Sequence, residues 1–202
     1  MPAHEMKSTR LEAFSDGVIA VIITIMVLEL HVPEAHGFAG FLHILPRLGI
    51  YGLSFLVVAI YWVNHHDLCS RTEVINYRVL WANLLFLFTL SLLPYFTDYV
   101  AEHHYDSFST ALYTVTFIVV AIGFLVLRLS LNGLHDDHEE KLPSRDRKET
   151  VKHITSLALY VIALPVAYYK PILSLALDFA VTLIWIVPEL GTQRPSHRKH
   201  RG

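Results

Sequence analysis

The sequence predicts an all-α membrane protein, built as a single domain of six transmembrane helices. Hydrophobic residues make up 53% of the 202 residues, the mean hydropathy is +0.44, and the apolar residues gather in long blocks. A helix needs roughly 20 mostly apolar residues to cross the hydrocarbon core of a bilayer, and the blocks approach that length. We therefore expect the membrane domain to fill residues 1–190 and a basic cytoplasmic tail to occupy residues 191–202.

The first block, residues 10–30, has a charged entry and an apolar body. Arg10, Glu12 and Asp16 recur at its start, and no ionisable side chain follows until Glu29. A carboxylate near the membrane core is costly unless it is paired, so Asp16 indicates a functional network with its neighbours. The alternative is a carboxylate at headgroup depth, which the dipole of the helix N-terminus favours.

The middle of this block carries one regular face. Val21, Thr24, Ile25 and Leu28 are spaced i, i+3, i+4 and i+7, and these positions share one side of a helix. We interpret this side as the wall of a passage in which Thr24 supplies the hydroxyl. The alternative for Thr24 is a hydrogen bond to a carbonyl of its own helix, which is common for threonine in membrane helices.

Five further apolar blocks complete the predicted bundle, at residues 45–64, 79–99, 110–129, 153–169 and 172–187. The last two blocks are short for a span, and Lys170-Pro171 between them is a natural tight turn. A re-entrant hairpin is therefore the alternative to two complete spans. We expect six spans because both short blocks are almost free of charge.

The distribution of basic residues predicts the orientation. With six spans, 14 of the 16 lysines and arginines fall on one side of the membrane, and only Arg47 and Lys170 fall on the other. Cytoplasmic loops of membrane proteins carry the excess of basic residues. We therefore expect a multi-pass protein of the cell inner membrane with both termini in the cytoplasm.

Polar residues also gather at the junction of the second and third blocks: Trp62, Asn64, His65, His66, Asp67, Trp81 and Asn83. Adjacent histidines on a helix point about 100° apart and rarely share an ion, so this run predicts a hydrogen-bond network more than a metal site. An interfacial anchor is the alternative for Trp62. The histidine-aspartate run at residues 135–138 belongs to a predicted solvated loop, residues 135–149. His103 and His104 are either surface histidines or pH sensors.

Several functional classes are disfavoured. The chain lacks GxSxG, HExxH and glycine-rich phosphate motifs, so we expect no enzymatic activity. The net charge of −2 argues against a nucleic-acid partner, and the single cysteine, Cys69, excludes an intramolecular disulfide. Asp178, the other acid deep in a predicted span, suits a proton relay or helix packing.

The heptapeptide RLEAFSD at residues 10–16 resembles the RxxxFSD signature of the transmembrane protein 175 potassium channel family. The continuation GVIAVIITIMVLEL is similar to the first span of bacterial members. The resemblance extends through WVNHH at 62–66 and WANLLFL at 81–87, and ends at PYF, 94–96. It covers the first three spans well and the remainder only as a hydropathy pattern.

The resemblance implies a homotetramer in the lipid bilayer, with the first helix of each subunit lining a central pore. This family lacks the TVGYG filter of ordinary potassium channels, and so does this chain. The family pattern implies a principal aliphatic ring at Val21, a threonine layer at Thr24 and an outer ring at Leu28. Family members commonly have isoleucine or leucine at the first of these positions, so the smaller Val21 widens the gate or shifts the seal to Ile25 or Leu28.

The implied signature network comprises Arg10, Phe14, Ser15 and Asp16, with partners Trp62, His66 and Asn83. Potassium is the permeant ion, passing near Thr24 with modest preference over sodium, and neither a fixed metal nor a cofactor is expected. A proton-coupled transporter that uses Asp16, Asp178 and membrane histidines is the alternative function. A structural or regulatory membrane protein without permeation is the third.

Overall fold

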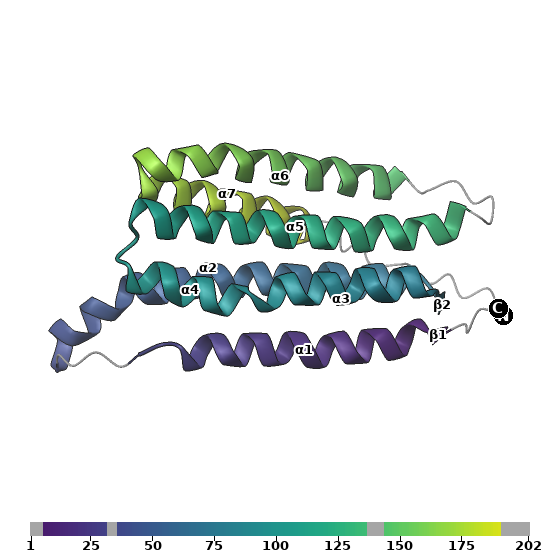
Figure 1. Cartoon of the computed structure of the whole chain (residues 1–202), viewed down its shortest axis with the longest axis horizontal. Helices are drawn as coiled ribbons and strands as arrows, with labels where there is room; N and C mark the ends of the chain where they lie inside the picture. Colours follow the sequence, from purple (N-terminus) through teal and green to yellow (C-terminus); the bar gives the residue numbers. More distant parts are fainter. Residues whose placement is uncertain (1–5, 32–35, 137–143, 191–202) are drawn as a thin grey trace, which may run out of the picture.

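The chain folds into a bundle of long helices (Figure 1). The computed structural model describes residues 6–31, 36–136 and 144–190. The helices are α1 (Ser8–Leu28), α2 (Gly37–Cys69), α3 (Tyr77–Ser91), α4 (Leu93–Glu102), α5 (Ser107–Asp136), α6 (Ser144–Tyr169) and α7 (Pro171–Leu190). Two strands of two residues each, β1 (Met6–Lys7) and β2 (Val74–Ile75), pair antiparallel.

Successive passes of the chain run in opposite directions along the bundle. We name its two ends by what lies there: the ladder end holds β1 and β2, and the turn end holds the α6–α7 turn at Lys170. Helix α1 leaves the ladder end, α2 returns to it, and α3 with α4 forms the third pass. The chain then runs back in α5, out again in α6, and returns toward the ladder end in α7 (Figure 1).

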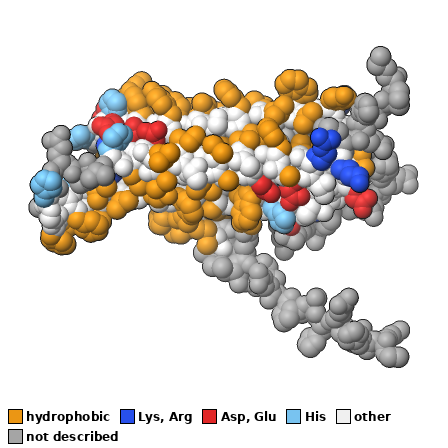
Figure 2. Space-filling model, turned by 90° about the horizontal axis from the view of Figure 1, so that it is seen from below, with side chains coloured by type: hydrophobic (Ala, Val, Ile, Leu, Met, Phe, Trp, Pro, Cys, Tyr) orange, Lys and Arg blue, Asp and Glu red, His pale blue; other side chains and the backbone are white. Residues whose placement is uncertain are grey.

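Five helical segments among the described residues are long and apolar enough to cross a membrane. They are Ser8–Leu28, Gly40–Cys69, Tyr77–Glu102, Ser107–Leu134 and Glu149–Tyr169, whereas the apolar part of α7, Pro171–Ile186, is shorter. Figure 2 looks onto the α1 side and shows a broad apolar band, with most charged side chains gathered toward the two ends. The structure therefore confirms a helical membrane protein, and the sixth crossing stays a prediction.

The helix boundaries differ from those predicted in three places. The third pass is divided at Leu92 into α3 and α4, because Pro94 has no N–H to donate and restricts the residue before it. Helix α2 begins at Gly37 instead of residue 45. Residues 135–136 and 144–149, predicted as loop, belong to α5 and α6. The remainder of that loop, 137–143, and the predicted tail, 191–202, lie outside the described residues.

The two-residue ladder is the exception to the predicted all-α fold. Met6 pairs with Ile75 and Lys7 with Val74, and the ladder ties the start of α1 to the α2–α3 connection. The backbone N–H of Ser8 donates to Glu73 O at 3.0 Å, and its hydroxyl donates to Cys69 O at 3.0 Å. Strands this short have too few positions to show an alternating pattern, so the sequence gives no signal for them.

Helix α5 is the centre of the packing. It contacts α3 and α4 on one side and α6 and α7 on the other, whereas α1 packs mainly against α2, α3 and α4. Phe86 of α3 and Phe124 of α5 meet edge to face with ring centroids 5.2 Å apart, and Tyr61 of α2 lies against both rings. Helix α1 is thus at the margin of the subunit, and α6 and α7 lie on the opposite side (Figure 1).

The close crossing of α3 and α5 yields a stability prediction. A Cβ added at Gly123 would lie 2.7 Å from Thr89 Oγ1 and 3.3 Å from the Phe86 Cα, so Gly123→Ala should destabilise the fold by about 1–3 kcal/mol. Gly133 of the same helix has nothing within 4 Å of its added Cβ, and Gly133→Ala should stabilise by about 0.5–1 kcal/mol. Thermal unfolding in detergent measures both, and equal stability of the two variants would contradict the close crossing.

Candidate functional site

Helix α1 buries one face and leaves the other uncovered. Its buried side chains are Ser8, Leu11, Ser15, Ile19, Ile22 and Met26, which repeat at the spacing of one helix side. On the other side Val21 is 55% exposed, Ile25 41% and Leu28 79%, and Thr24 is exposed as well. The structure therefore places all four residues of the predicted passage on the side that the rest of the subunit does not cover.

The Thr24 hydroxyl donates to the carbonyl of Val21 at 2.9 Å. This is the bond to its own helix that the sequence allowed as an alternative. It does not make the oxygen unavailable, because a hydroxyl has one hydrogen and two acceptor lone pairs. With its hydrogen turned to the helix backbone, Thr24 presents an oxygen acceptor on the exposed face, which is the group that coordinates a cation.

An open groove of about 650 Å³ runs along the same helix. One wall is α1, where Ala13 and Gly17 are exposed and an added Cβ at Gly17 would meet nothing within 4 Å. The facing wall is formed by residues from the α3–α4 junction onward, including Pro94, Tyr95 and Asp98. Val21 and Ile25 line this groove, whereas Thr24 and Leu28 lie outside its lining.

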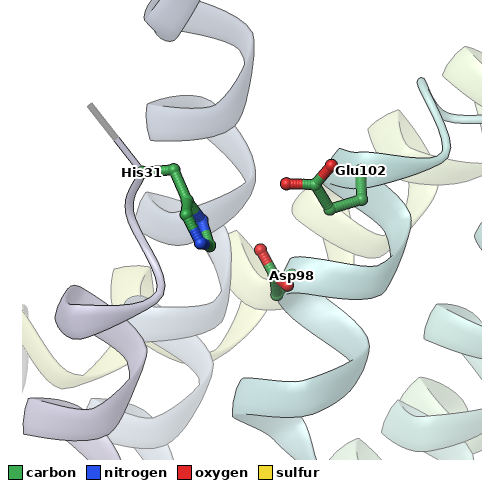
Figure 3. Close-up of side chains that lie close together, drawn as sticks. All are labelled: His31, Asp98 and Glu102. Carbon is green, nitrogen blue, oxygen red and sulfur yellow. The ribbon is translucent and has the colours of Figure 1, made fainter. Parts of the chain in front are cut away.

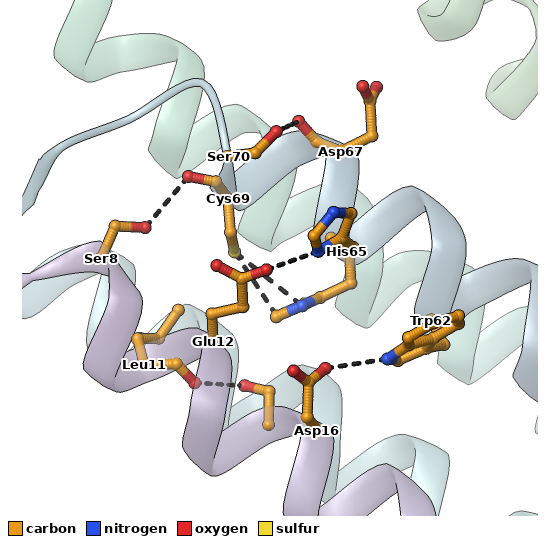
Figure 4. Close-up of polar contacts among 11 residues, drawn as sticks. Ser8, Leu11, Glu12, Asp16, Trp62, His65, Asp67, Cys69 and Ser70 are labelled. Atoms are coloured by element: carbon orange, nitrogen blue, oxygen red, sulfur yellow. Dashed lines mark hydrogen bonds and ion pairs between the residues drawn. The ribbon is translucent and has the colours of Figure 1, made fainter.

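Hydrogen bonds at the ladder half of the bundle fix α1 against α2 and α3. Trp62 Nε1 of α2 donates to Asp16 Oδ1 at 2.8 Å (Figure 4). The Asn83 amide of α3 donates to the Ser15 hydroxyl at 2.9 Å, and Ser15 in turn donates to the Leu11 carbonyl. The side chains of Ser15 and Asn83 are completely buried. The structure thus brings together four of the residues of the predicted signature network.

The remaining residues of that network lie elsewhere. His66 Nδ1 is 2.5 Å from Glu12 Oε1, so His66 contacts α1 through a residue that the prediction left out. Arg10 is exposed and makes no hydrogen bond or ion pair with any residue that the structure describes. Phe14 is 54% exposed and lies along the groove. The structure therefore gives neither Arg10 nor Phe14 a packing role inside the subunit.

Three residues outside the implied signature network complete it, and His65 is one of the polar run for which the sequence predicts a hydrogen-bond network. His65 Nε2 lies 2.8 Å from Asn83 Oδ1, and His65 is completely buried. Cys69, one turn further along α2, places its sulfur 3.7 Å from the same His65 nitrogen (Figure 4). Glu12 precedes Asp16 by one turn, and that i, i+4 spacing on the signature helix was the available signal for it.

A second polar cluster lies at the turn end of α1. His31, Asp98 and Glu102 point toward one another, with candidate ligand atoms within 4.8 Å (Figure 3). Arg47 of α2 lies among them, with Nη2 2.6 Å from Glu102 Oε1 and Nη1 3.3 Å from His31 Nδ1. Its guanidinium already supplies the positive charge there. We therefore interpret the cluster as an ion-pair contact between the outer part of α1, α2 and α4, not as a metal site.

The two membrane acids of the alternative transporter hypothesis belong to separate networks. Asp16 bonds to Trp62 of α2, whereas Asp178 of α7 bonds to Thr114 of α5. Among the described residues, no chain of side-chain hydrogen bonds connects the two acids. A relay between Asp16 and Asp178 therefore has no support in the geometry.

Comparisons with known proteins agree with the resemblance found in the sequence. Residues 10–94 match the family model described as the endosomal/lysosomal potassium channel TMEM175. A potassium channel of a Chryseobacterium species (strain P1-3) is 38% identical over 187 residues, covering 91% of this chain and 95% of that protein. A chicken protein named endosomal/lysosomal proton channel TMEM175 is 26% identical over 136 residues, which are 65% of this chain and 27% of that protein.

A solved structure is similar along nearly the whole chain. The crystal structure of a lysosomal potassium-selective channel TMEM175 homolog from Chamaesiphon minutus superposes with a TM-score of 0.76 and 26% sequence identity. The match covers 90% of this chain and 97% of that one. Most of the helical bundle described above is therefore shared with a structure determined by experiment.

The buried Asn83 yields a prediction about the network. Asn83→Ala removes the donor to Ser15 and the partner of His65 in a fully buried position, so it should destabilise by about 1–3 kcal/mol. Asn64→Ala is the control, because among the described residues the Asn64 amide bonds only to the Ile60 carbonyl of its own helix. This substitution should cost less than about 0.5 kcal/mol. If unfolding in detergent shows equal losses, the network does not hold α1 in place.

Proposed function

The chain belongs to the TMEM175 potassium channel family, and we propose that it is itself a potassium channel, a homotetramer whose central pore is lined by α1. A protein of this family is an ion channel and not an enzyme. The observation that carries the proposal is the uncovered face of α1. Aliphatic side chains and one hydroxyl line up there, on a helix at the margin of the subunit. Four such faces around an axis enclose a narrow apolar passage.

The groove beside α1 supports the assembly. It opens on the same side as the uncovered face, and Ala13 and Gly17 let a neighbouring helix approach closely. We propose that α1 of an adjacent subunit occupies it. Ile25 then faces the junction between subunits, because it lines the groove and is less exposed than Val21 and Leu28, whereas Val21, Thr24 and Leu28 turn toward the axis.

In this arrangement the passage has two kinds of layer. Rings of aliphatic side chains at Val21 and Leu28 exclude water from the axis, and a dewetted constriction stops ions without a physical plug. The Thr24 oxygens form the polar layer between these rings. They replace part of the hydration shell of a passing potassium ion, which gives modest selectivity over sodium.

The basic residues support an orientation. Near the ladder end lie Lys7, Arg10, Arg71, Arg78, Arg128 and Lys152, whereas Arg47 and Lys170 lie near the turn end. By the positive-inside rule the ladder end faces the cytoplasm. With α7 as a sixth span, both termini are then cytoplasmic in a bacterial inner membrane.

Proton flux through the same pore is the second candidate function. Vertebrate relatives are named proton channels, and these relatives match this chain over 136 residues. A proton-coupled transporter predicts saturable, pH-driven flux of a solute, whereas a channel predicts passive flux down the gradient of each ion. Liposomes that report both potassium and internal pH separate these cases.

The first test is potassium flux through the purified protein in liposomes. Passive potassium flux is expected for the natural chain, and Val21→Trp or Leu28→Trp should reduce it to the protein-free background by filling the axis. Val161→Trp is the control, because Val161 is 53% exposed on α6, which lies on the opposite side of the bundle from α1. Undiminished flux through both pore variants would exclude α1 as the pore wall.

The second test addresses selectivity. Thr24→Val keeps the shape of the side chain but removes its oxygen, so the ratio of potassium to sodium flux should fall while total flux persists. Thr116→Val is the matched control, because Thr116 also donates to a carbonyl of its own helix, at 2.9 Å, but is buried in α5. An unchanged ratio in the Thr24→Val channel would place the selective layer elsewhere.

A further inference from the structure

Asp178 is a carboxyl group buried inside the subunit, away from the proposed pore. It lies on α7, its exposed fraction is 0%, and its position is about 10 Å along the helix from the turn end. Its neighbours belong to α5 and α6, which lie across the bundle from α1 (Figure 1). No role in conduction accounts for an acid at this place.

Among the residues that the structure describes, the carboxyl group has no counter-charge. The one hydrogen-bond partner of its side chain is Thr114 Oγ1, 2.9 Å from Oδ2, and Oδ1 has none among the described residues. No lysine, arginine or histidine of the described residues forms an ion pair with it. The titratable groups that face it are the neutral phenols of Tyr113 from α5 and Tyr160 from α6. An ionised carboxylate in such surroundings is among the most costly groups to bury.

The hydrogen bonds around Asp178 can be counted. Thr114 Oγ1 contacts Asp178 Oδ2 at 2.9 Å and Ser174 Oγ at 3.4 Å, and Ser174 donates to the Ala163 carbonyl at 3.0 Å. These are three contacts, and the two hydroxyls supply only two hydrogens. A carbonyl cannot donate, so the hydrogen of Ser174 is committed to Ala163. Thr114 can then serve Ser174 or Asp178, but not both.

A hydrogen on Asp178 supplies the third hydrogen that these three contacts need. The acid then donates to Thr114, Thr114 donates to Ser174, and Ser174 donates to Ala163, so every contact has its hydrogen. An ionised Asp178 would take the hydrogen of Thr114, leave the long Thr114–Ser174 contact without one, and keep a charged Oδ1 with no partner. The count and the missing counter-charge are independent, and both favour the protonated acid.

We propose that Asp178 is a proton-binding site, filled at neutral pH. The bound proton completes a chain of hydrogen bonds that holds α7 against α5 and α6. A sodium or potassium ion would need several oxygen ligands in its shell, whereas the proton needs only the acceptor already in place. The proton is held and not conducted. The proposal rests on the burial of α7 and is independent of whether the chain conducts potassium.

The first test is infrared spectroscopy of the purified full chain at about pH 7. The spectrum should contain the C=O stretching band of a protonated carboxylic acid, shifted in D₂O, and Asp178→Asn should lose that band. Thr114→Val should keep the band but move it to higher frequency, because the acid loses its acceptor. Absence of a band that depends on Asp178 would overturn the proposal.

Asp106→Asn is the matched control for the band. Asp106 is an exposed acid in the α4–α5 turn, and the backbone N–H of Ser109 donates to its Oδ1 at 2.7 Å. Hydrogen bonds from Ser109 hold the pKa of Asp106 below its ordinary value, so this acid is ionised at neutral pH. The Asp106→Asn protein should therefore keep the whole band. Loss of the band in this variant would show that it comes from Asp106 and not from Asp178.

The second test is thermal unfolding between about pH 7 and about pH 9, below the range in which tyrosine and lysine lose protons. The proton on Asp178 adds one to the protons that the folded chain binds relative to the unfolded chain, so Asp178 should make the melting temperature fall as the pH rises. Asp178→Asn should flatten that fall and, as a neutral isostere, melt within a few degrees of the natural chain at the lower pH. The same slope in both proteins would overturn the proposal.

Replacing sodium and potassium by choline identifies the alternative occupant. An unchanged melting temperature in choline supports a proton at Asp178. A melting temperature that rises with sodium or potassium in the natural chain, and not in Asp178→Asn, would show a metal cation there and overturn the proposal.

Discussion

The rotation of α1 about its own axis depends on one buried hydrogen bond, from the Asn83 amide to the Ser15 hydroxyl. A helix advances about 100° per residue, so fixing Ser15 toward α3 also fixes the direction of every side chain that follows. Ile19, Ile22 and Met26 turn into the subunit as a consequence, and Val21, Thr24 and Leu28 turn out of it. A slip by a single residue would rotate the helix by about 100° and turn Thr24 away from the outer face.

Much of this arrangement follows from the sequence. The apolar blocks predict the passes of the chain. The residues of the uncovered face of α1 can be grouped from their helical spacing in the sequence, without knowledge of the tertiary structure. The comparisons confirm the family resemblance carried by RxxxFSD and extend it over most of the chain. Asp16 and Ser15 also meet the elements suggested for them, since their polarity demands partners inside a membrane.

The partners themselves were harder to assign. His65 and His66 are adjacent, and which of them turns inward depends on the rotation of α2, so the sequence places both in a polar network but does not show that His65 is the buried one. The cluster of His31, Arg47, Asp98 and Glu102 draws on three separate parts of the chain, and only the tertiary fold brings them together. The break at Leu92 has a local cause in Pro94, but the continuous hydropathy of the block conceals it.

The β1–β2 ladder has a mechanical consequence. It anchors the first residues of α1 together with the bonds of Ser8 and Ser15, whereas the far end of the helix is held by the buried side chains of Ile22 and Met26 and by exposed polar contacts around His31. Such a helix can tilt about a fixed point near Ser15, and Leu28 lies about 20 Å from that point. A swing of about 5° moves Leu28 by roughly 2 Å and barely displaces Asp16. Small motions of the subunit are thus amplified at Leu28, and Ser15 and Asp16 stay in place.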